Sequence, residues 1–478
     1  MEDESKIDWE RRYIQLLERV TALEARITNL EAENVILKAE NLALKAENRD
    51  LREKLNTSSG NSSKPPSQDP FRKTRSSTPS GKKPGGQPGH EGHKRKTYPP
   101  EEVTKTVNLK PVSCPSCSGC QFDEMPVSID LRQVIELPDM PPEITQYNIH
   151  TCRCGHCGKH VRADVPKEAE RGFGPRLMGF VTMLTGEGHV TKRKICALAG
   201  HLGLKISLGA LCNIHKLASV ILEEPSQAIH KHVMEQEQVN GDESGWKLRS
   251  KLCWIWIGAT RTATVFKIDP SRSREAFKRI FGGFKGTLTT DRHGAYNDHE
   301  GDKQTCLAHI KRDFEKVSER PEIDGSIARI LQEQLGLIFK SWAEFKEGSI
   351  VRTVLQTRAE EPIENIRVTL MFAAQNAKSS KTVAFAYNIL DRFPTLWTFL
   401  YQEGVEPTNN LAERGLRPAV IFRKISGGSQ SEWGLRFVER LMTVVCTLKQ
   451  NTGNVFEFLT KSFQSHLGAR APPSLLLR

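Results

Sequence analysis

The chain has 478 residues, which is enough for roughly two to four domains, at least one of them with a large hydrophobic core. Lysine and arginine together exceed aspartate and glutamate by 12, and this excess favours a polyanionic partner, nucleic acid above all. No apolar run reaches the roughly 18 residues of a membrane span, and the acidic first residues lead into no signal peptide. These features exclude a membrane-spanning class and predict a cytoplasmic protein, whose 11 cysteines are metal ligands or buried thiols rather than disulfides.

Residues 1–56 carry a heptad repeat that predicts a coiled coil. The d positions are Leu16, Leu23, Leu30, Leu37, Leu44 and Leu51, and the a positions are Tyr13, Val20, Ile27, Asn34, Asn41 and Asn48. Leucine at d with asparagine at a favours a parallel dimer, because paired buried asparagines fix the register. We therefore expect a homodimer or higher oligomer through this helix. The alternative is a long solvated helix that packs on its own domain.

Residues 57–100 have a different composition, dominated by Ser, Pro, Gly and basic side chains. The segment carries nine Lys and Arg residues against Asp69 and Glu91, and too few apolar side chains to offset the entropy cost of ordering. We expect a basic, disordered linker that rests on phosphate backbones and is released by salt. A linker that merely keeps the protein soluble is the alternative.

Two Cys-x-x-Cys pairs lie about forty residues apart within residues 101–166. Their members are Cys114, Cys117, Cys154 and Cys157. Four thiolates at this spacing predict a tetrahedral, structural Zn²⁺ site, and the alternating pattern over 127–150 predicts the strands of a zinc ribbon. Gly158 suits the tight turn in which backbone N–H groups face sulfur. Metal-free thiols are the alternative, and the ligand set stays open because other candidates are close in sequence, namely Cys120, Cys152 and His156.

Residues 167–235 have helical periodicity. A helix from Lys192, a turn containing Gly203 and a helix that begins at Ser207 make the helix–turn–helix pattern of DNA-binding domains. The second helix has few basic residues at its start, so an ordinary helical hairpin is the alternative.

From residue 236 the periodicity changes to that of strands. We expect strands over 239–248, 253–260 and 264–268, then a helix over 273–281 and a fourth strand over 286–291. An antiparallel meander, a crossing helix and a fourth strand begin an RNase H-like fold. Residues 236–300 are therefore predicted to form the first part of a catalytic domain, in which Asp242 and Asp291 lie side by side.

The rest of the chain is predicted to complete this domain around a helical insertion. The segments are a helical insertion over 301–405, the second part of the RNase H-like domain over 406–450 and a C-terminal tail over 451–478. In the second part we expect a helix start at Asn410, a short strand or loop after Pro418, and a helix over 431–449. The predicted fold class is thus multidomain α+β.

Glu413 lies among basic side chains in the stretch from Thr408 to Pro418. One interpretation is structural, in which Asn410 caps a helix that Glu413 stabilises by capping or by pairing with Arg417. The other is catalytic: Glu413 joins two upstream aspartates in a three-carboxylate site. Such a site would bind two Mg²⁺ about 3.5–4 Å apart, because carboxylate oxygens are suitable ligands for this cation.

Several basic residues surround Glu413 in the sequence. We expect them to hold the phosphodiester backbone, or alternatively to form only a solvated basic face. They are Arg414, Arg417, Arg423 and Lys424. His309 has two interpretations, a DNA-contacting residue near the scissile phosphate or a buried structural histidine beside Cys306.

The ordered set of motifs resembles that of the insertion sequence 66 transposases over nearly the whole chain. The shared elements are the leucine zipper, NSSKPPSQD, GGQPGHEGH, the paired CxxC motifs, GDES, TDRHGAY, CLAHIKRDF and NNLAERGLRP with FRK. The resemblance implies a bacterial, nucleoid-associated DDE transposase with Mg²⁺ and with a catalytic triad of Asp242, Asp291 and Glu413. The implied partners are the terminal inverted repeats of the element, target DNA and accessory transposition proteins. Ser244 departs from the family pattern, which has threonine more often at this position.

Two other functions remain open from the sequence alone. One is a catalytically inactive DNA-binding regulator that uses the zipper, the ribbon and the helical hairpin. The other is an RNase H-like nuclease or resolvase, which would cut DNA without joining the ends.

Overall fold

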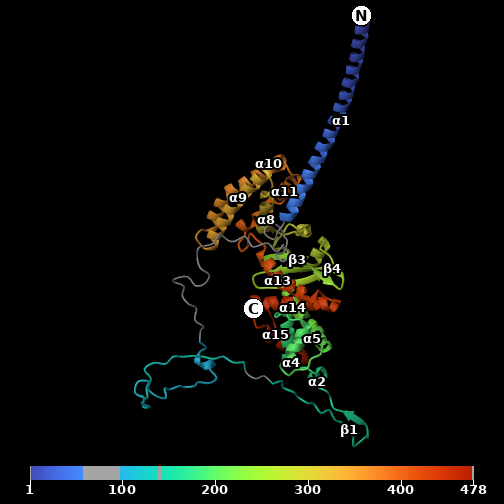
Figure 1. Ribbon diagram of the computed structural model, residues 1–478. Coiled ribbons are helices and arrows are strands. Elements are labelled where there is room, and N and C mark those ends of the chain that lie inside the picture. The colour runs from blue at the N-terminus through green and yellow to red at the C-terminus, as the bar shows by residue number, and fades with distance from the viewer. Residues whose placement is uncertain (1, 57–96, 138–140, 476–478) are drawn as a thin grey trace. The chain divides into compact units, whose positions relative to one another are not determined.

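The computed structural model describes residues 2–56, 97–137 and 141–475, and Figure 1 shows its helices and strands. Most of the linker predicted over 57–100 lies outside the described residues. The chain divides into two compact units, one of Met1–Pro70, Val165–Ile195 and Leu208–Arg478, the other of Phe71–Asp164 and Cys196–Ser207. The finer domain boundaries stay predictions. Within the described part of the chain, no helix has the length and apolar character needed to cross a bilayer.

Helix α1 spans Glu2–Asn56, as the heptad pattern predicts. No proline or glycine interrupts it, so nothing in the sequence removes a helical hydrogen bond. Its d-position leucines stay about half exposed or more, from 49% at Leu51 to 63% at Leu16. An apolar stripe of this length is therefore available to a partner helix, and oligomerisation itself remains a prediction.

The second unit contains a short 3₁₀ helix, η2 (Pro100–Glu102), and a small antiparallel hairpin of β1 (Thr151–Arg153) and β2 (His160–Arg162). The strands expected over 127–150 are absent from the described residues of that range. The alternating apolar residues are exposed there, 94% in the case of Val134. An alternating segment forms a β-strand only where another strand hydrogen bonds with its backbone. The described residues contain no such partner strand for this segment.

Five helices precede the central sheet: α2 (Lys167–Arg171), α3 (Pro175–Gly186), α4 (Lys192–His201), α5 (Leu208–Ile221) and α6 (Glu223–Met234). The helices expected on both sides of Gly203 are therefore present. Helix α5 packs on α14 (Glu432–Gln450), where the ring of His215 stacks on Phe437 at 4.7 Å. This packing buries one face of α5, and the role of α4 and α5 in DNA binding stays a prediction.

A five-stranded sheet forms the centre of the first unit (Figure 1). Its elements are β3 (Gln238–Leu248), β4 (Lys251–Ala259), β5 (Thr264–Asp269), α7 (Arg274–Phe281), β6 (Thr287–Thr290), the 3₁₀ helix η3 (Gly294–Asp298) and β7 (Lys303–Thr305). The order is β5-β4-β3-β6-β7, with β3, β4 and β5 antiparallel and β6 and β7 parallel to β3. The predicted meander, crossing helix and fourth strand are confirmed, and the arrangement is consistent with an RNase H-like core. Strand β7 was not predicted, because three residues are too few to show a period.

Helix α14 closes the free edge of this sheet. Every second N–H of β5 donates to every fourth side chain of the helix: Thr264 to Thr447 (3.1 Å), Phe266 to Thr443 (2.9 Å) and Ile268 to Glu439. The match follows from geometry, because four helical residues rise about 6 Å and two strand residues about 6.7 Å. An edge satisfied in this way is not available for pairing with another strand.

The helical segment between β7 and residue 405 has its own hydrophobic core. It consists of α8 (Leu307–Ser318), α9 (Glu322–Lys346), α10 (Arg352–Asn376), α11 (Ser380–Asp391), the 3₁₀ helix η4 (Phe393–Leu396) and α12 (Thr398–Tyr401). Buried Asp324 of α9 accepts the N–H groups of Lys378 (2.8 Å) and Ser379 (3.0 Å), which satisfies donors at the start of α11.

Helix α13 spans Asn410–Ser426 and corrects two local predictions. The strand or loop expected after Pro418 is wrong, because the helix continues through this proline and ends at Gly427, whose φ is 71°. Proline costs the helix one hydrogen bond, but the buried face of Ala412 and Leu416 continues at Ala419 beyond it. The helix cap is also displaced, since Asn409 and not Asn410 occupies the N-cap position. The final two helices, α14 and α15 (Val455–Leu467), begin at the capping side chains of Ser431 and Asn454.

Candidate active site

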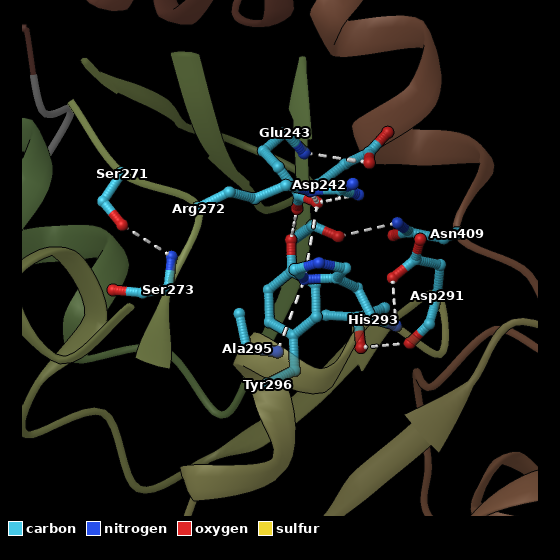
Figure 2. A network of polar contacts seen from close by, with 12 residues as sticks. Asp242, Glu243, Ser271, Arg272, Ser273, Asp291, His293, Ala295, Tyr296 and Asn409 are labelled. Carbon is cyan, nitrogen blue, oxygen red and sulfur yellow. Dashed lines mark hydrogen bonds and ion pairs between the residues drawn. The ribbon is translucent and has the colours of Figure 1, made fainter. Parts of the chain in front are cut away.

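Strands β3 and β6 bring two aspartates to equivalent positions in the sheet. The strands are parallel, and their register pairs Asn240 with Thr289. Asp242 and Asp291 each lie two residues beyond this pair, Asp242 within β3 and Asp291 directly after the end of β6 (Figure 2). One carboxylate oxygen of Asp242 accepts the Glu243 N–H at 2.9 Å, and one oxygen of Asp291 accepts the His293 N–H at 2.8 Å.

Helix α13 carries Glu413 to the same sheet. The helix packs on β3 and β4, and Phe422 stacks on buried Trp246 at 6.3 Å with the rings 18° apart. Gly415 allows the close approach, because a Cβ at this position would lie 2.7 Å from Ile257 of β4. Glu413 lies in the first turn of α13.

The pKa of Asp242 is affected by burial and by the charges of other acids near it. Burial raises this pKa well above its usual range, and the charges of Glu243, Asp291 and Glu413 raise it further, against the lowering effect of the Glu243 N–H. Acids from β3, from the end of β6 and from α13 thus repel one another. A bound divalent cation would relieve this repulsion.

Glu413 faces two basic side chains of α8 without hydrogen bonding to either. Its Oε1 atom lies 3.6 Å from Nδ1 of His309 and 3.5 Å from Nη2 of Arg312, and this oxygen is buried without a hydrogen-bond partner. Burial lowers the pKa of His309, and the Arg312 charge lowers it further, so the neutral imidazole is favoured. A cavity of about 300 Å³ opens beside this group, lined by Ala308, Lys311, Arg312, Phe339, Thr408, Asn410 and Glu413.

Asp242, Asp291 and Glu413 do not lie close enough together to form one ligand group among the described residues, whereas Cys306 completes one with His309 and Glu413. Its sulfur, a ring nitrogen of His309 and an oxygen of Glu413 all lie within 4.8 Å of one another, which makes them the group of three that the described residues offer to one ion. The thiol is fully buried, burial raises its pKa, and its sulfur accepts the Asn409 N–H at 3.1 Å. These properties favour a neutral thiol with a structural hydrogen bond.

A buried polar network lies on the opposite side of β3 from α13. Arg272 donates to Oε1 of Glu243 through Nε (2.6 Å) and Nη2 (2.5 Å), and the Tyr296 hydroxyl donates to Oε2 (Figure 2). Burial and then the charge of Asp291 raise the pKa of Glu243, which Tyr296 and Arg272 partly offset. These hydrogen bonds hold Glu243, the residue next to Asp242, on the face of β3 that α13 does not cover.

The predicted DNA-binding residues of α13 divide into two groups. Arg414, Arg417 and Lys424 are exposed, at the spacing of one helical face. Arg423 is half-buried and donates to Ser244 Oγ (3.1 Å) and to the Gly245 carbonyl, so it anchors α13 to β3. Burial lowers the pKa of this guanidinium.

Comparison with known proteins identifies the family. The model of the transposase IS66 family matches residues 172–437, more than half of the chain, and a family of unknown function matches residues 14–96. The chain belongs to the IS66 transposase family. The match begins before α3 and extends into α14, so it includes the sheet and all three acids of the candidate site.

Two curated relatives come from Sinorhizobium fredii (strain NBRC 101917 / NGR234). This IS66 family member is 24% identical to the uncharacterized protein y4qI over 57% of its own length and 53% of the relative. It is 22% identical to the uncharacterized protein y4hP over 75% of its own length and 71% of the relative. The chain therefore spans about half the length of the first relative.

The two cysteine pairs of this transposase family member form matching turns. The Cys114 N–H donates to Gly119 O and the Ser118 N–H to Cys114 O, and the same two bonds recur from Cys154 to Lys159 and from Gly158 to Cys154. In each turn, backbone N–H groups lower the pKa of the first thiol. The two turns thus share one hydrogen-bond pattern, and the described residues do not hold the four sulfurs as one group.

Several residues of the site were not identified from the sequence. They are Glu243, Arg272, Tyr296, Arg312 and Asn409. Four of them lie in motifs that were noticed for other residues, GDES, TDRHGAY, CLAHIKRDF and NNLAERGLRP. Arg272 lies in no such motif, and its partner Glu243 is 29 residues away, so only the folded chain shows the contact.

Proposed function

We propose that this IS66 family member is a DDE transposase that cleaves DNA at the terminal inverted repeats of a bacterial insertion sequence and joins the ends to target DNA. The observation that carries the proposal is the placement of three acids from distant segments around one sheet: Asp242 and Asp291 lie at equivalent positions on the paired strands β3 and β6, and Glu413 lies in the first turn of α13, which packs on β3. Asp242, Asp291 and Glu413 would be the catalytic carboxylates.

The donor set fits the divalent metal that DDE chemistry requires. Carboxylate oxygens are hard ligands suited to Mg²⁺, and the buried Oε1 of Glu413 has no hydrogen-bond partner. Two bound Mg²⁺ would activate the attacking oxygen and stabilise the leaving 3′ oxygen. The role of the chain is to hold the three acids at fixed positions and to keep their oxygens free for this purpose.

The basic residues around the acids suit the phosphodiester backbone. Arg414, Arg417 and Lys424 present positive charge on the exposed face of α13, one, four and eleven residues beyond Glu413. Lys311 and Arg312 line the cavity beside Glu413. Such side chains position the backbone without reading its sequence, and each phosphate contact makes binding more sensitive to salt.

The N-terminal segments supply assembly and stability in this proposal. The exposed leucine stripe of α1 pairs with a second copy in parallel, because the asparagines at positions 34, 41 and 48 meet their own counterparts only in that orientation. Cys114, Cys117, Cys154 and Cys157 hold a structural Zn²⁺, for which the matching N–H turns favour thiolate at two of the ligands.

A strand-transfer assay with labelled terminal-repeat DNA tests the proposal. The variants Asp242→Asn, Asp291→Asn and Glu413→Gln are expected to bind the DNA ends and to lose cleavage and joining. Glu333→Gln is the matched control, because this glutamate is exposed on α9 away from the site. If the wild type cut the ends without joining them, the chain would be a nuclease or resolvase. If the three variants joined DNA as well as the control, the assignment of the acids would be wrong.

A further inference from the structure

Asn409 is fully buried, and all four of its polar groups are engaged. Its side-chain amide donates to the Gly241 carbonyl at 2.7 Å, and its side-chain oxygen accepts the amide of Asn240 at 3.0 Å. Both partners immediately precede Asp242 on β3. Asn409 therefore connects the start of α13 to the strand that carries the first acid.

The backbone of Asn409 makes the other two bonds. Its carbonyl accepts the Glu413 N–H at 3.1 Å, and its N–H donates to Cys306 Sγ at 3.1 Å. The N–H of Cys306 in turn donates to the carbonyl of Thr290 at 2.9 Å, and Thr290 immediately precedes Asp291. A continuous path of hydrogen bonds thus joins the chain at all three acids.

We propose that Asn409 and Cys306 are positioning residues that hold the backbones of the three catalytic acids at the separation their metals require. The inference rests on the proposed function, because it assigns these residues to the same site. It explains how segments 103 and 168 residues apart in the chain keep the three acids at fixed positions. In this arrangement both residues act through hydrogen bonds to the backbone next to the acids.

The N-cap geometry separates this role from ordinary helix capping. Asn409 occupies the N-cap position, but its side chain makes no capping hydrogen bond to α13. The amide is used for contacts to a residue 168 positions away instead. An aspartate would cap a helix equally well, but its second oxygen would face the Gly241 carbonyl and would add a negative charge beside Asp242.

Metal affinity is the measurement that a merely structural role would not change. Mn²⁺ binding to the full chain is followed by electron paramagnetic resonance, with Asp242→Asn to identify the binding that belongs to the acid site. Asn409→Ala and Asn409→Asp are each expected to weaken this binding by at least about tenfold, the usual effect of removing a residue that orients metal ligands. Cys306→Ala is expected to do the same, whereas Cys306→Ser, which keeps an acceptor for the Asn409 N–H, retains the wild-type affinity.

Thr443→Val controls for loss of stability. This change leaves the buried Phe266 N–H unpaired at the far edge of the sheet, and we expect Mn²⁺ affinity to be unchanged. The inference is overturned if Asn409→Ala binds Mn²⁺ like the wild type, or if Thr443→Val weakens binding as much. The proposed function fails separately, if Asp242→Asn leaves the Mn²⁺ affinity of the chain unchanged.

Discussion

Removing the Tyr296 hydroxyl tests the buried network beside the candidate acids. This hydroxyl donates to Oε2 of Glu243, whose side chain is completely buried, while Arg272 occupies Oε1. Tyr296→Phe keeps the ring and its edge-on packing against Trp256 and Phe277. The change therefore removes one hydrogen bond to a charged, buried acceptor and little else.

The expected cost follows from that single bond. A hydrogen bond to a charged group contributes about 1.5–3 kcal/mol, and the buried oxygen cannot recover the loss from water. Arg272 still neutralises Glu243, so the cost stays below that of a buried, unpaired charge. An energy of this size corresponds to a roughly 10- to 150-fold rise in the opening equilibrium of the local structure.

Hydrogen–deuterium exchange of β3 measures this opening locally, which avoids assuming that a multidomain chain unfolds in one step. Amides of Gln238–Leu248 are expected to exchange faster in Tyr296→Phe by the stated factor. Tyr387→Phe is the matched control, because this tyrosine is 59% exposed on α11, and it is expected to change nothing. Equal exchange in wild type and Tyr296→Phe would refute the argument that the hydroxyl stabilises Glu243.

Further predictions concern other parts of the chain. Thr443→Val leaves the buried Phe266 N–H without an acceptor, so unfolding in urea should become easier by about 1–3 kcal/mol, and an unchanged midpoint would contradict the role of α14 at the sheet edge. Burial lowers the pKa of His215 to about 3, so between pH 6.5 and that value the unfolded chain binds a proton that the folded chain does not. The free energy of unfolding should therefore decrease as the pH is lowered, by up to about 1.4 kcal/mol per pH unit, and His215→Phe should reduce this dependence in urea titrations. Leu30→Asp introduces charge into the exposed stripe of α1 and should halve the mass measured by light scattering, whereas a wild type that is already monomeric would exclude the zipper. Cys154→Ser should abolish the zinc that mass spectrometry of the metal content detects, and retained zinc would exclude this ligand.

Features that depend on neighbours in the chain could be predicted from the sequence. The three strands of the meander and helix α7 follow their periodicity, and α14 begins where Ser431 can accept the Gly434 N–H. The cysteine turns are local as well, since their hydrogen bonds close within five residues. Periodicity also misled over 127–150, whose described residues form no strand and are mostly exposed.

The candidate site depends on contacts that local sequence does not specify. The sequence indicated Asp242, Asp291 and Glu413 by their motifs, but their placement around one sheet depends on the parallel pairing of β3 with β6 and on the packing of α13 on β3. The correction from Asn410 to Asn409 has the same origin. Pattern alone predicts a capping asparagine, whereas the partners of Asn409 are 103 and 168 residues distant and become neighbours only in the folded chain.

The sequence by itself thus determined the α+β class, the long N-terminal helix, the order of elements and the family, because periodicity and motifs are properties of short segments. Only the tertiary structure decided which residues support the acids: Glu243 and Asn409 are buried polar groups whose burial is tolerated because distant partners satisfy them. A buried hydrogen bond between remote segments leaves no periodic trace in either one. For this reason the candidate acids could be named from the chain, and their buried polar neighbours could not.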